Sequence, residues 1–187
     1  QVSDKLTQFE SNVVLWCRFI DDIFVIWRGD EEAALQFVRD LNTNEYNLRF
    51  TEHLNPRCIE FLDVEIAVRD NKLVSKLYRK TTAGNNLLCA HSAHPGTLIR
   101  SIPFGELLRA RRNCSETADF QLECEVMCER FRKRGYGAKV IDQARRKVES
   151  LNRADVLYGT KRGRVKENDS IRFITTYNNQ SYKIRTI

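Results

Sequence analysis

Two adjacent carboxylates, Asp21 and Asp22, are the residues of this chain whose types and spacing point most directly to chemistry. They stand between two short apolar runs, residues 13–17 and 23–27, whose β-branched and aromatic side chains predict buried strands. Carboxylates beside buried strands need either a divalent cation or a solvated hairpin turn to offset their desolvation. The residues alone leave both alternatives open. If a metal binds, oxygen ligands favour Mg²⁺, and side-chain alternation gives Asp21 the main role and Asp22 a supporting one.

The elements that would position this pair follow it directly in the sequence. Residues 30–41 carry apolar side chains at helical spacing, which predicts an amphipathic helix that begins at Gly29 or Asp30. Residues 46–51 alternate between apolar and polar side chains, which predicts a strand.

A further predicted hairpin carries a second pair of carboxylates. Its strands, residues 59–66 and 72–78, flank Asp70-Asn71, a dipeptide typical of a tight turn. Asp63 and Glu65 would share one face of the first of these strands. Alternation along a half-exposed strand accounts for both side chains without chemistry, and we therefore assign them no catalytic role.

Charge is distributed unevenly along the chain. Residues 1–95 contain 11 Lys/Arg and 14 Asp/Glu, a net charge of −3, and residues 96–187 contain 20 and 11, a net charge of +9. Basic side chains that neutralise phosphates release condensed counterions, which gives affinity for nucleic acid without sequence preference. A solvated basic surface is the alternative. We expect the second half of the chain to carry a phosphate-binding surface.

That basic half is expected to be helical. Pro103 is expected to open a first helix that runs through Arg112, and Ser115 to cap a second helix that ends before Gly135. The inward positions of the second and third helices are Phe120, Cys124, Met127, Cys128 and Phe131, and then Val140, Ile141, Ala144, Val148 and Leu151. Three short helices with tight turns fit either a polymerase thumb or a helix-turn-helix module.

An ordered series of motifs resembles the reverse transcriptases of Penelope-like retroelements over about residues 13–177. Residues 18–24, Arg-Phe-Ile-Asp-Asp-Ile-Phe, look like motif C of right-hand polymerases. The motifs that follow are Phe61-Leu62-Asp63-Val64, Lys76-Leu77-Tyr78-Arg79-Lys80, His94-Pro95, Ser101-Ile102-Pro103-Phe104-Gly105, Leu108-Arg109-Ala110-Arg111-Arg112-Asn113-Cys114, and Phe131 with Gly135-Tyr136. Phe19 stands where the family more often has Tyr, and Thr81, Cys89 and His91 also differ from the residues that the family usually has at these positions.

The resemblance implies a fold and a reaction. The fold class is α+β: a partial right-hand polymerase palm, made of antiparallel hairpins plus one helix, followed by an α-helical thumb. The reaction is RNA-directed DNA synthesis, in which a pair of Mg²⁺ ions (Mn²⁺ as the alternative) about 4 Å apart assists nucleotidyl transfer. Asp21 and Asp22 would be the catalytic metal ligands. The partners would be an RNA template, a DNA primer and their hybrid duplex, and the complete element's enzyme would work in the nucleus.

The same resemblance sets the expected domain organisation. Residues 1–80 would form the C-terminal part of the palm, residues 81–158 the thumb, and residues 159–187 a basic loop and a terminal strand. Fingers and an earlier palm strand with another metal-binding Asp precede motif C in the family, so we expect a fragment that is inactive alone. The alternative is a non-catalytic, helix-turn-helix-like nucleic-acid-binding module. The expected nucleic-acid-binding residues are Phe19, Arg109, Arg111, Arg112, Lys133, Arg145, Arg146 and Lys147.

Cysteine and histidine usage offers a rival chemistry. Cys89, His91 and His94 lie close together in sequence, but their spacing resembles no common zinc framework, and Cys124 and Cys128 fall on an apolar helix stripe. Six cysteines without clustered spacing or a signal peptide are typical of reduced thiols in an intracellular protein. No apolar run approaches the roughly 20 residues that span a bilayer, so we expect no membrane partner.

Overall fold

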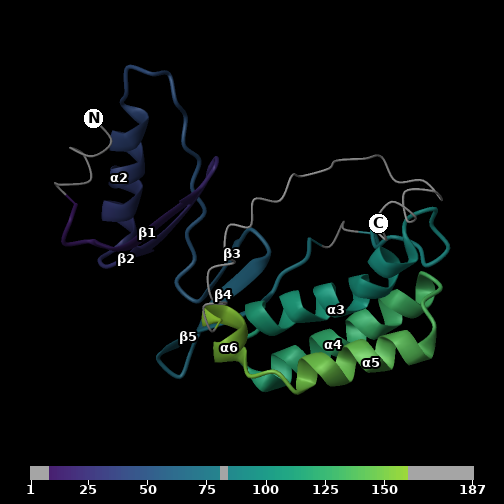
Figure 1. The fold of residues 1–187 in the computed structure, drawn as a ribbon. Coiled ribbons are helices and arrows are strands. Elements are labelled where there is room, and N and C mark those ends of the chain that lie inside the picture. Colours follow the sequence, from purple (N-terminus) through teal and green to yellow (C-terminus); the bar gives the residue numbers. More distant parts are fainter. Residues whose placement is uncertain (1–8, 81–83, 160–187) are drawn as a thin grey trace, which may run out of the picture. The chain divides into compact units, whose positions relative to one another are not determined.

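The computed structural model describes residues 9–80 and 84–159, and the chain divides into two compact units, Gln1–Tyr78 and Arg79–Ile187 (Figure 1). We call the described parts of these units the hairpin unit and the helical unit. Across the described residues the secondary structure is mixed α and β, with two small antiparallel sheets and five helices, which confirms the expected α+β class. None of these helices is both long and apolar enough to cross a membrane. The loop and strand expected at 159–187 lie almost wholly outside the described residues.

The hairpin unit begins with the two strands that flank the carboxylate pair. Strands β1 (Val13–Phe19) and β2 (Asp22–Trp27) pair antiparallel, with Phe19 opposite Asp22. Helix α2 (Glu31–Asn42) follows, and the Asp30 side chain caps it by accepting a 2.7 Å hydrogen bond from the Ala33 N–H. The Phe37 ring of α2 lies 5.4 Å from Trp27 and 6.2 Å from Trp16, so aromatic contacts hold the helix on the hairpin.

The expectation that both strands of this hairpin are buried was wrong for β1. Val14 and Leu15 are 52% and 41% exposed, whereas most of β2 is partly covered. The reason is that one helix covers one face of a two-stranded sheet within this unit. Within the hairpin unit, the side chains of Val14 and Leu15 on β1 are therefore left largely exposed.

The second sheet of the hairpin unit is a three-stranded meander of β3 (Cys58–Phe61), β4 (Val64–Arg69) and β5 (Lys72–Leu77). The turn at Asp70-Asn71 is confirmed, and both residues adopt positive φ, +50° and +58°, as a type I′ turn requires. Residues 59–66, however, are not one strand. A turn at Leu62-Asp63, where Leu62 has a φ of +55°, divides them into β3 and β4.

This turn changes the surroundings of the second carboxylate pair. Asp63 lies in the turn rather than beside Glu65 on one strand, and its carbonyl accepts a 2.7 Å hydrogen bond from the Tyr78 N–H. Glu65 lies on β4 opposite Lys76 of β5, and the two side chains form a 2.8 Å ion pair. The hydrogen bond that the Lys76 ammonium group donates to Glu65 lowers the pKa of the Glu65 carboxyl below its usual value. The turn and the ion pair therefore account for Asp63 and Glu65 without a catalytic role.

The strand predicted at residues 46–51 is absent, because two asparagine side chains take up the backbone groups that a strand would pair. Asn44 receives hydrogen bonds from the Tyr46 and Leu48 N–H groups and donates one to the Leu48 carbonyl. Asn42 likewise bonds both backbone groups of Phe50, with distances of 2.6 and 3.0 Å. Local side-chain bonds of this kind compete with a strand ladder.

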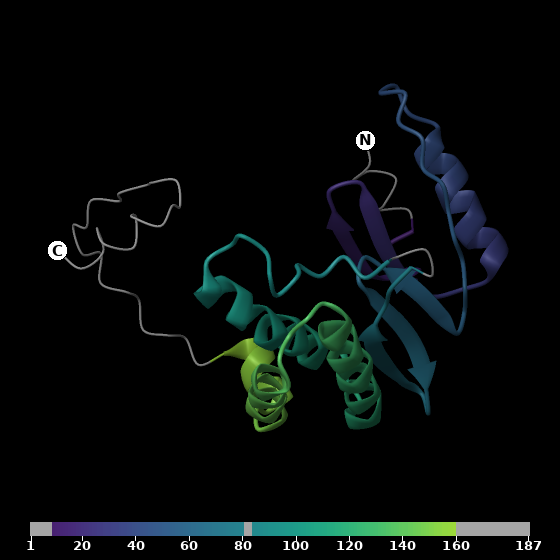
Figure 2. The same cartoon turned by 90° about the vertical axis from the view of Figure 1, so that its right-hand side faces the viewer.

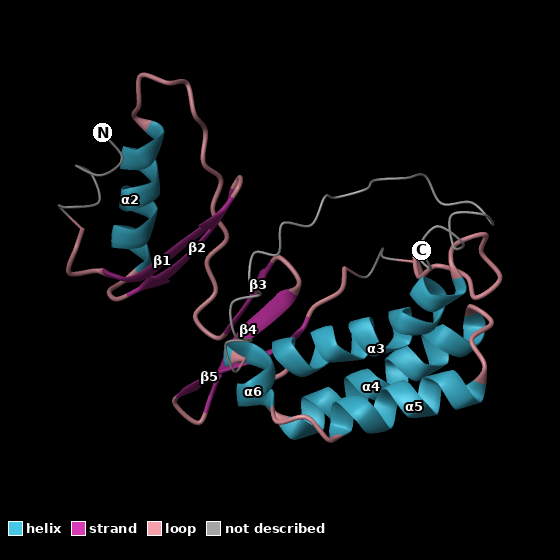
Figure 3. Cartoon of the chain, in the orientation of Figure 1, coloured by secondary structure: helices cyan, strands magenta, loops and turns pink. Residues whose placement is uncertain are grey.

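The helical unit is built from α3 (Gly96–Asn113), α4 (Thr117–Lys133), α5 (Ala138–Glu149) and the short α6 (Arg153–Tyr158) (Figures 2 and 3). The stripe predicted for α4 is confirmed in full, since its buried residues are Phe120, Cys124, Met127, Cys128 and Phe131. For α5, Ile141, Ala144 and Val148 are buried as predicted, and Val140 and Leu151 are half-buried. Helix α6, which begins at a capping Asn152, was not expected as a separate helix.

Two predicted helix starts were wrong. Pro103 does not open α3 but lies inside it, seven residues after Gly96, where it is buried among the core side chains. Its ring costs one backbone hydrogen bond, and this tight packing offsets that cost. The cap of α4 is Glu116 rather than Ser115, one residue later than predicted.

Candidate functional site

The carboxylate pair lies at the tip of the β1–β2 hairpin. Asp21 occupies the two-residue turn and Asp22 is the first residue of β2, and both side chains are exposed. Ile20 precedes them with a φ of +51°, and its carbonyl accepts a 2.9 Å hydrogen bond from Arg18 Nε. A β-branched residue pays about 1–2 kcal/mol to enter the left-handed region. The turn therefore holds the pair in a strained backbone rather than in a relaxed Gly or Asn turn.

The donors at this tip are those of a hard cation, but there are only two of them. Across the described residues, no group of three or more His, Cys, Asp or Glu side chains is placed to hold a metal ion. Mg²⁺ is commonly held by one or two carboxylates while it keeps several waters, so Asp21 and Asp22 fit a weak site for it. Phe19, the predicted aromatic of the site, is 53% exposed beside them. The described residues likewise contain no cluster of Cys and His side chains that is placed to hold zinc. His94 Nδ1 instead lies 2.6 Å from the Ser92 hydroxyl oxygen.

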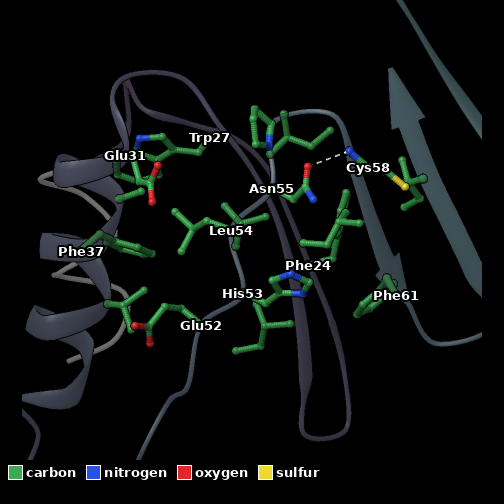
Figure 4. Close-up of a pocket in the computed structure, with 18 of the residues that line it drawn as sticks. Phe24, Trp27, Glu31, Phe37, Glu52, His53, Leu54, Asn55, Cys58 and Phe61 are labelled. Carbon is green, nitrogen blue, oxygen red and sulfur yellow. Dashed lines mark hydrogen bonds between the residues drawn. The ribbon is translucent and has the colours of Figure 1, made fainter. Parts of the chain in front are cut away.

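A cleft of about 540 Å³ opens in the hairpin unit between α2, β2 and the segment 50–57 (Figure 4). Its walls are mainly apolar and include Phe24, Trp27 and Phe37. The Trp27 Nε1 group is buried without a hydrogen-bond acceptor among the described residues. At the opposite wall, burial and the neighbouring Glu65 carboxylate raise the pKa of the Cys58 thiol, so this cysteine is a poor nucleophile.

In the helical unit, a tight turn joins α4 to α5 at residues 134–137. Gly135 adopts a φ of +81°, its N–H bonds the Arg132 carbonyl at 3.0 Å, and the Tyr136 N–H bonds the Phe131 carbonyl at 3.1 Å. The rings of Phe131 and Tyr136 pack with their centroids 5.7 Å apart. Together these contacts form a Schellman motif with its hydrophobic contact, which fixes the direction in which α5 leaves α4.

Residues 84–95, which we call the strap, run along α4 to this turn. The Tyr136 hydroxyl donates to the Leu88 carbonyl at 3.0 Å, and the Ala90 N–H donates to the Arg134 carbonyl at 2.9 Å. Further along α4, Asn85 donates to the Arg130 carbonyl at 3.0 Å, and Arg130 in return reaches the Gly84 carbonyl. The strap thus holds the end of α4 in place.

A partly buried ion pair fixes the start of the helical unit. Arg79 Nη1 donates to Glu123 Oε2 at 2.8 Å, and its other nitrogen contacts Glu123 Oε1 and the Met127 sulfur. Sequence reasoning did not single out this pair. Arg79 belongs to the Lys-Leu-Tyr-Arg-Lys motif, but this motif does not reveal that the partner of Arg79 lies 44 residues further along the sequence.

The predicted nucleic-acid-binding cations are mostly engaged within the helical unit. Arg145 pairs with Glu149 at 2.7 Å, Lys133 with Glu129 at 2.7 Å, and Arg109 with Glu106 at 3.8 Å. Arg111 and Lys147 lie over the rings of Phe120 and Phe104, 4.9 and 4.6 Å from the centroids. Arg146 bonds the Asp142 carbonyl at 3.3 Å, and the exposed Arg112 contributes its carbonyl to Arg153.

Three cysteines of the helical unit, Cys114, Cys124 and Cys128, belong to its core, whereas Cys89 of the strap is exposed. Burial raises the pKa of Cys124 to about 12 and also raises that of Cys128, so both stay neutral thiols at physiological pH. Cys114, Cys124 and Cys128 are each no more than 2% exposed, as expected of small apolar residues on a helix stripe. They therefore hold the bundle together rather than bind a ligand.

Comparison with known proteins finds a family match within the helical unit. Residues 86–146 match the animal helix-turn-helix domain family, a stretch that covers most of the strap, α3, α4 and most of α5. No curated protein and no solved structure matches the chain. The match covers about a third of the sequence, and it coincides with the helices that meet at the Schellman turn.

Proposed function

We propose that the helical unit is a nucleic-acid-binding module of the helix-turn-helix type. The observation that carries the proposal is the family match over residues 86–146, because the matched stretch includes α4 and most of α5, two helices joined by a short turn that contains Gly135. In this motif a turn of three or four residues, often with a glycine, joins the two helices, and the second helix approaches the major groove. The basic second half of the sequence supports the same conclusion.

The test is the salt dependence of binding by the whole chain. A labelled 20-base-pair duplex of mixed sequence is titrated at several salt concentrations, and log affinity is plotted against log salt. The proposal predicts a straight line of negative slope, since each phosphate contact adds about 0.9 to its magnitude on duplex DNA. Titration with an RNA–DNA hybrid compares the duplex that the polymerase resemblance favours. Failure to bind either duplex at 50 mM salt would contradict the proposal.

A second function is supported by the carboxylate hairpin: the hairpin unit is part of a reverse transcriptase palm. The specific observation is the strained turn at Ile20, because backbone strain of this kind collects at functional sites. The outer edge of β2 has no strand partner among the described elements, and residues 51–54, also beside the cleft, form no hydrogen bond to other described residues. These backbone groups could pair with the earlier palm strand that the resemblance implies.

If the hairpin unit is part of a polymerase palm, Asp21 and Asp22 would hold Mg²⁺, or Mn²⁺ in its place. The ion would stabilise negative charge during nucleotidyl transfer. The chain's own part is geometric. The hairpin turn presents the carboxylates to solvent, and the exposed Phe19 ring beside them offers a surface for a primer or nucleotide. Positioning and electrostatics account for nearly all catalysis in phosphoryl transfer, so two carboxylates without a third leave the site incomplete.

Primer extension on an RNA template tests this second function. The 187-residue chain alone should show no extension. A chain extended with fingers and the first palm strand should be active, and Asp21→Asn should abolish that activity, while Asp63→Asn, a matched control in a structural turn, should largely preserve it. Robust synthesis by the 187 residues, or an extended enzyme indifferent to Asp21→Asn, would contradict the assignment.

A further inference from the structure

We infer that the helical unit meets the phosphate backbone at the end formed by the α4–α5 turn, through Arg100, Arg132 and Lys139. This inference rests on the proposed nucleic-acid binding and deepens it. It differs from the expectation from sequence, which placed most of the contacts on the last turns of α3 and α5.

The elements that carry these three residues lie at one end of the bundle. Lys147 of α5 lies beside Phe104 of α3, and Arg111 further along α3 donates to the Leu151 carbonyl after α5, so the two helices run in the same direction. Their first turns therefore share an end, and the C-terminus of the antiparallel α4 meets them there (Figures 1 and 3). The strap reaches the same end, with Ala90 bonded to Arg134 and the His91 ring beside Gly135.

Three cations at this end are available, whereas Lys133 beside them is paired with Glu129. Arg100, Arg132 and Lys139 are exposed, and none of their side chains forms a hydrogen bond or ion pair with another described residue. At the opposite end, the cations are held by carboxylates, aromatic rings or backbone carbonyls, with Arg112 as the exception. A paired cation has part of its hydrogen-bonding capacity and charge already engaged when it contacts a phosphate, whereas these three make no such direct contact and Arg132 has only a longer-range attraction to Glu129.

Helix electrostatics account for only part of the cluster. Arg132 and Lys133 lie in the last turn of α4, where cations complement the negative end of the helix dipole. Lys139 lies in the first turn of α5, where a cation opposes the dipole, and that turn contains no acidic residue and no capping side chain. Stability of the helix therefore gives no reason for Lys139, whereas a bound phosphate would.

The position of Lys139 also agrees with the geometry of the motif. In a helix-turn-helix, the second helix of the pair meets nucleic acid with its N-terminal residues. With α4 and α5 taken as the pair, as proposed above, that helix is α5, and the Schellman turn fixes its start. The family match, which ends at residue 146, includes all three of the cations named here.

The experiment compares three triple variants of the 187-residue chain in the duplex titration described above. The test variant is Arg100→Gln, Arg132→Gln and Lys139→Gln. If each residue makes one contact, the salt slope falls by up to about 2.7 and the affinity at 0.1 M salt by up to about 500-fold. A control, Arg49→Gln, Arg57→Gln and Lys72→Gln, makes the same change in net charge on the hairpin unit and should leave the slope unchanged. Circular dichroism confirms that each variant is folded.

The third variant, Arg109→Gln, Arg112→Gln and Arg146→Gln, decides between the two ends of the bundle. A smaller loss than that of the test variant supports the inference. An equal or greater loss overturns it and leaves nucleic-acid binding in place. Equal effects of the test variant and the charge-matched control also overturn it. Absence of binding by the unsubstituted chain contradicts the proposed function itself, so the two failures are distinguishable.

Discussion

The turn between α4 and α5 depends on one glycine, and Gly135→Ala should destabilise the helical unit by about 1–2 kcal/mol. Gly135 has a φ of +81°, a conformation that costs an L-residue about this much. A Cβ there would also lie 3.1 Å from the His91 Nε2 atom, so the His91 side chain must move slightly to admit it. The loss thus combines backbone strain with displacement of a packed neighbour.

Gly105→Ala is the matched control for this change. Gly105 lies inside α3 with ordinary helical backbone, and a Cβ there would meet no atom within 4 Å. Alanine at an open helix position is favoured over glycine by about 0.5–1 kcal/mol, so this variant should be more stable than the parent. The two variants change the same atoms and are expected to move stability in opposite directions.

Urea unfolding followed by far-ultraviolet circular dichroism measures both effects, because most of the helix lies in the helical unit. Tryptophan fluorescence serves as an internal reference, since both tryptophans, Trp16 and Trp27, belong to the hairpin unit. A Gly135→Ala chain as stable as the Gly105→Ala chain would refute the assigned turn conformation.

Four further measurements test other parts of the structure. Glu123→Gln removes the partner of the partly buried Arg79 and should lower the free energy of unfolding in urea by about 1.5–3 kcal/mol. The control Glu129→Gln breaks an exposed pair with Lys133 and should lower it by less. Equal losses for the two variants would contradict the Arg79–Glu123 pair. Ile20→Gly should stabilise the hairpin unit by about 1 kcal/mol through relief of its positive φ, and a loss of fluorescence-detected stability would contradict the strain. Hydrogen bonding to Lys76 lowers the pKa of Glu65, so its stabilisation is present above the ordinary value of 4.5 and is lost as the pH falls through the lowered pKa; the parent chain should lose more stability below pH 4.5 than Glu65→Gln does. A thiol reagent at pH 8 should label Cys17 and Cys89 in the folded chain but not Cys114, Cys124 or Cys128, and rapid labelling of these three would contradict the packed core.

Local patterns in the sequence predicted those elements whose cause is also local. The β1–β2 hairpin, the Asp30 cap and the buried stripe of α4 follow from alternation, capping chemistry and helical spacing. The turn at Asp70-Asn71 was predictable because both residues tolerate positive φ. Leu62 adopts the same conformation against its propensity, so no residue type marked the turn that separates β3 from β4.

The elements that were mispredicted depend on contacts that the sequence pattern does not encode. Residues 46–51 alternate as a strand does, but Asn42 and Asn44 capture their backbone. Pro103 is tolerated inside α3 only because its ring is buried. At the candidate site, residue type identified the cations but not their partners, so Lys147 could not be foreseen to lie over Phe104. Whether a cation is free to contact a phosphate depends on its neighbours in the folded chain, which the sequence pattern does not show.

The most direct test of nucleic-acid binding by the helical unit is a map of the amide signals that move when a duplex is added. The isotope-labelled 187-residue chain is titrated with a 20-base-pair duplex at low salt and followed by two-dimensional nuclear magnetic resonance. The proposal predicts shifts confined to the strap, α3, α4 and α5, and largest around residues 132–139. Shifts confined to the hairpin unit, or no shifts at millimolar duplex, would contradict it.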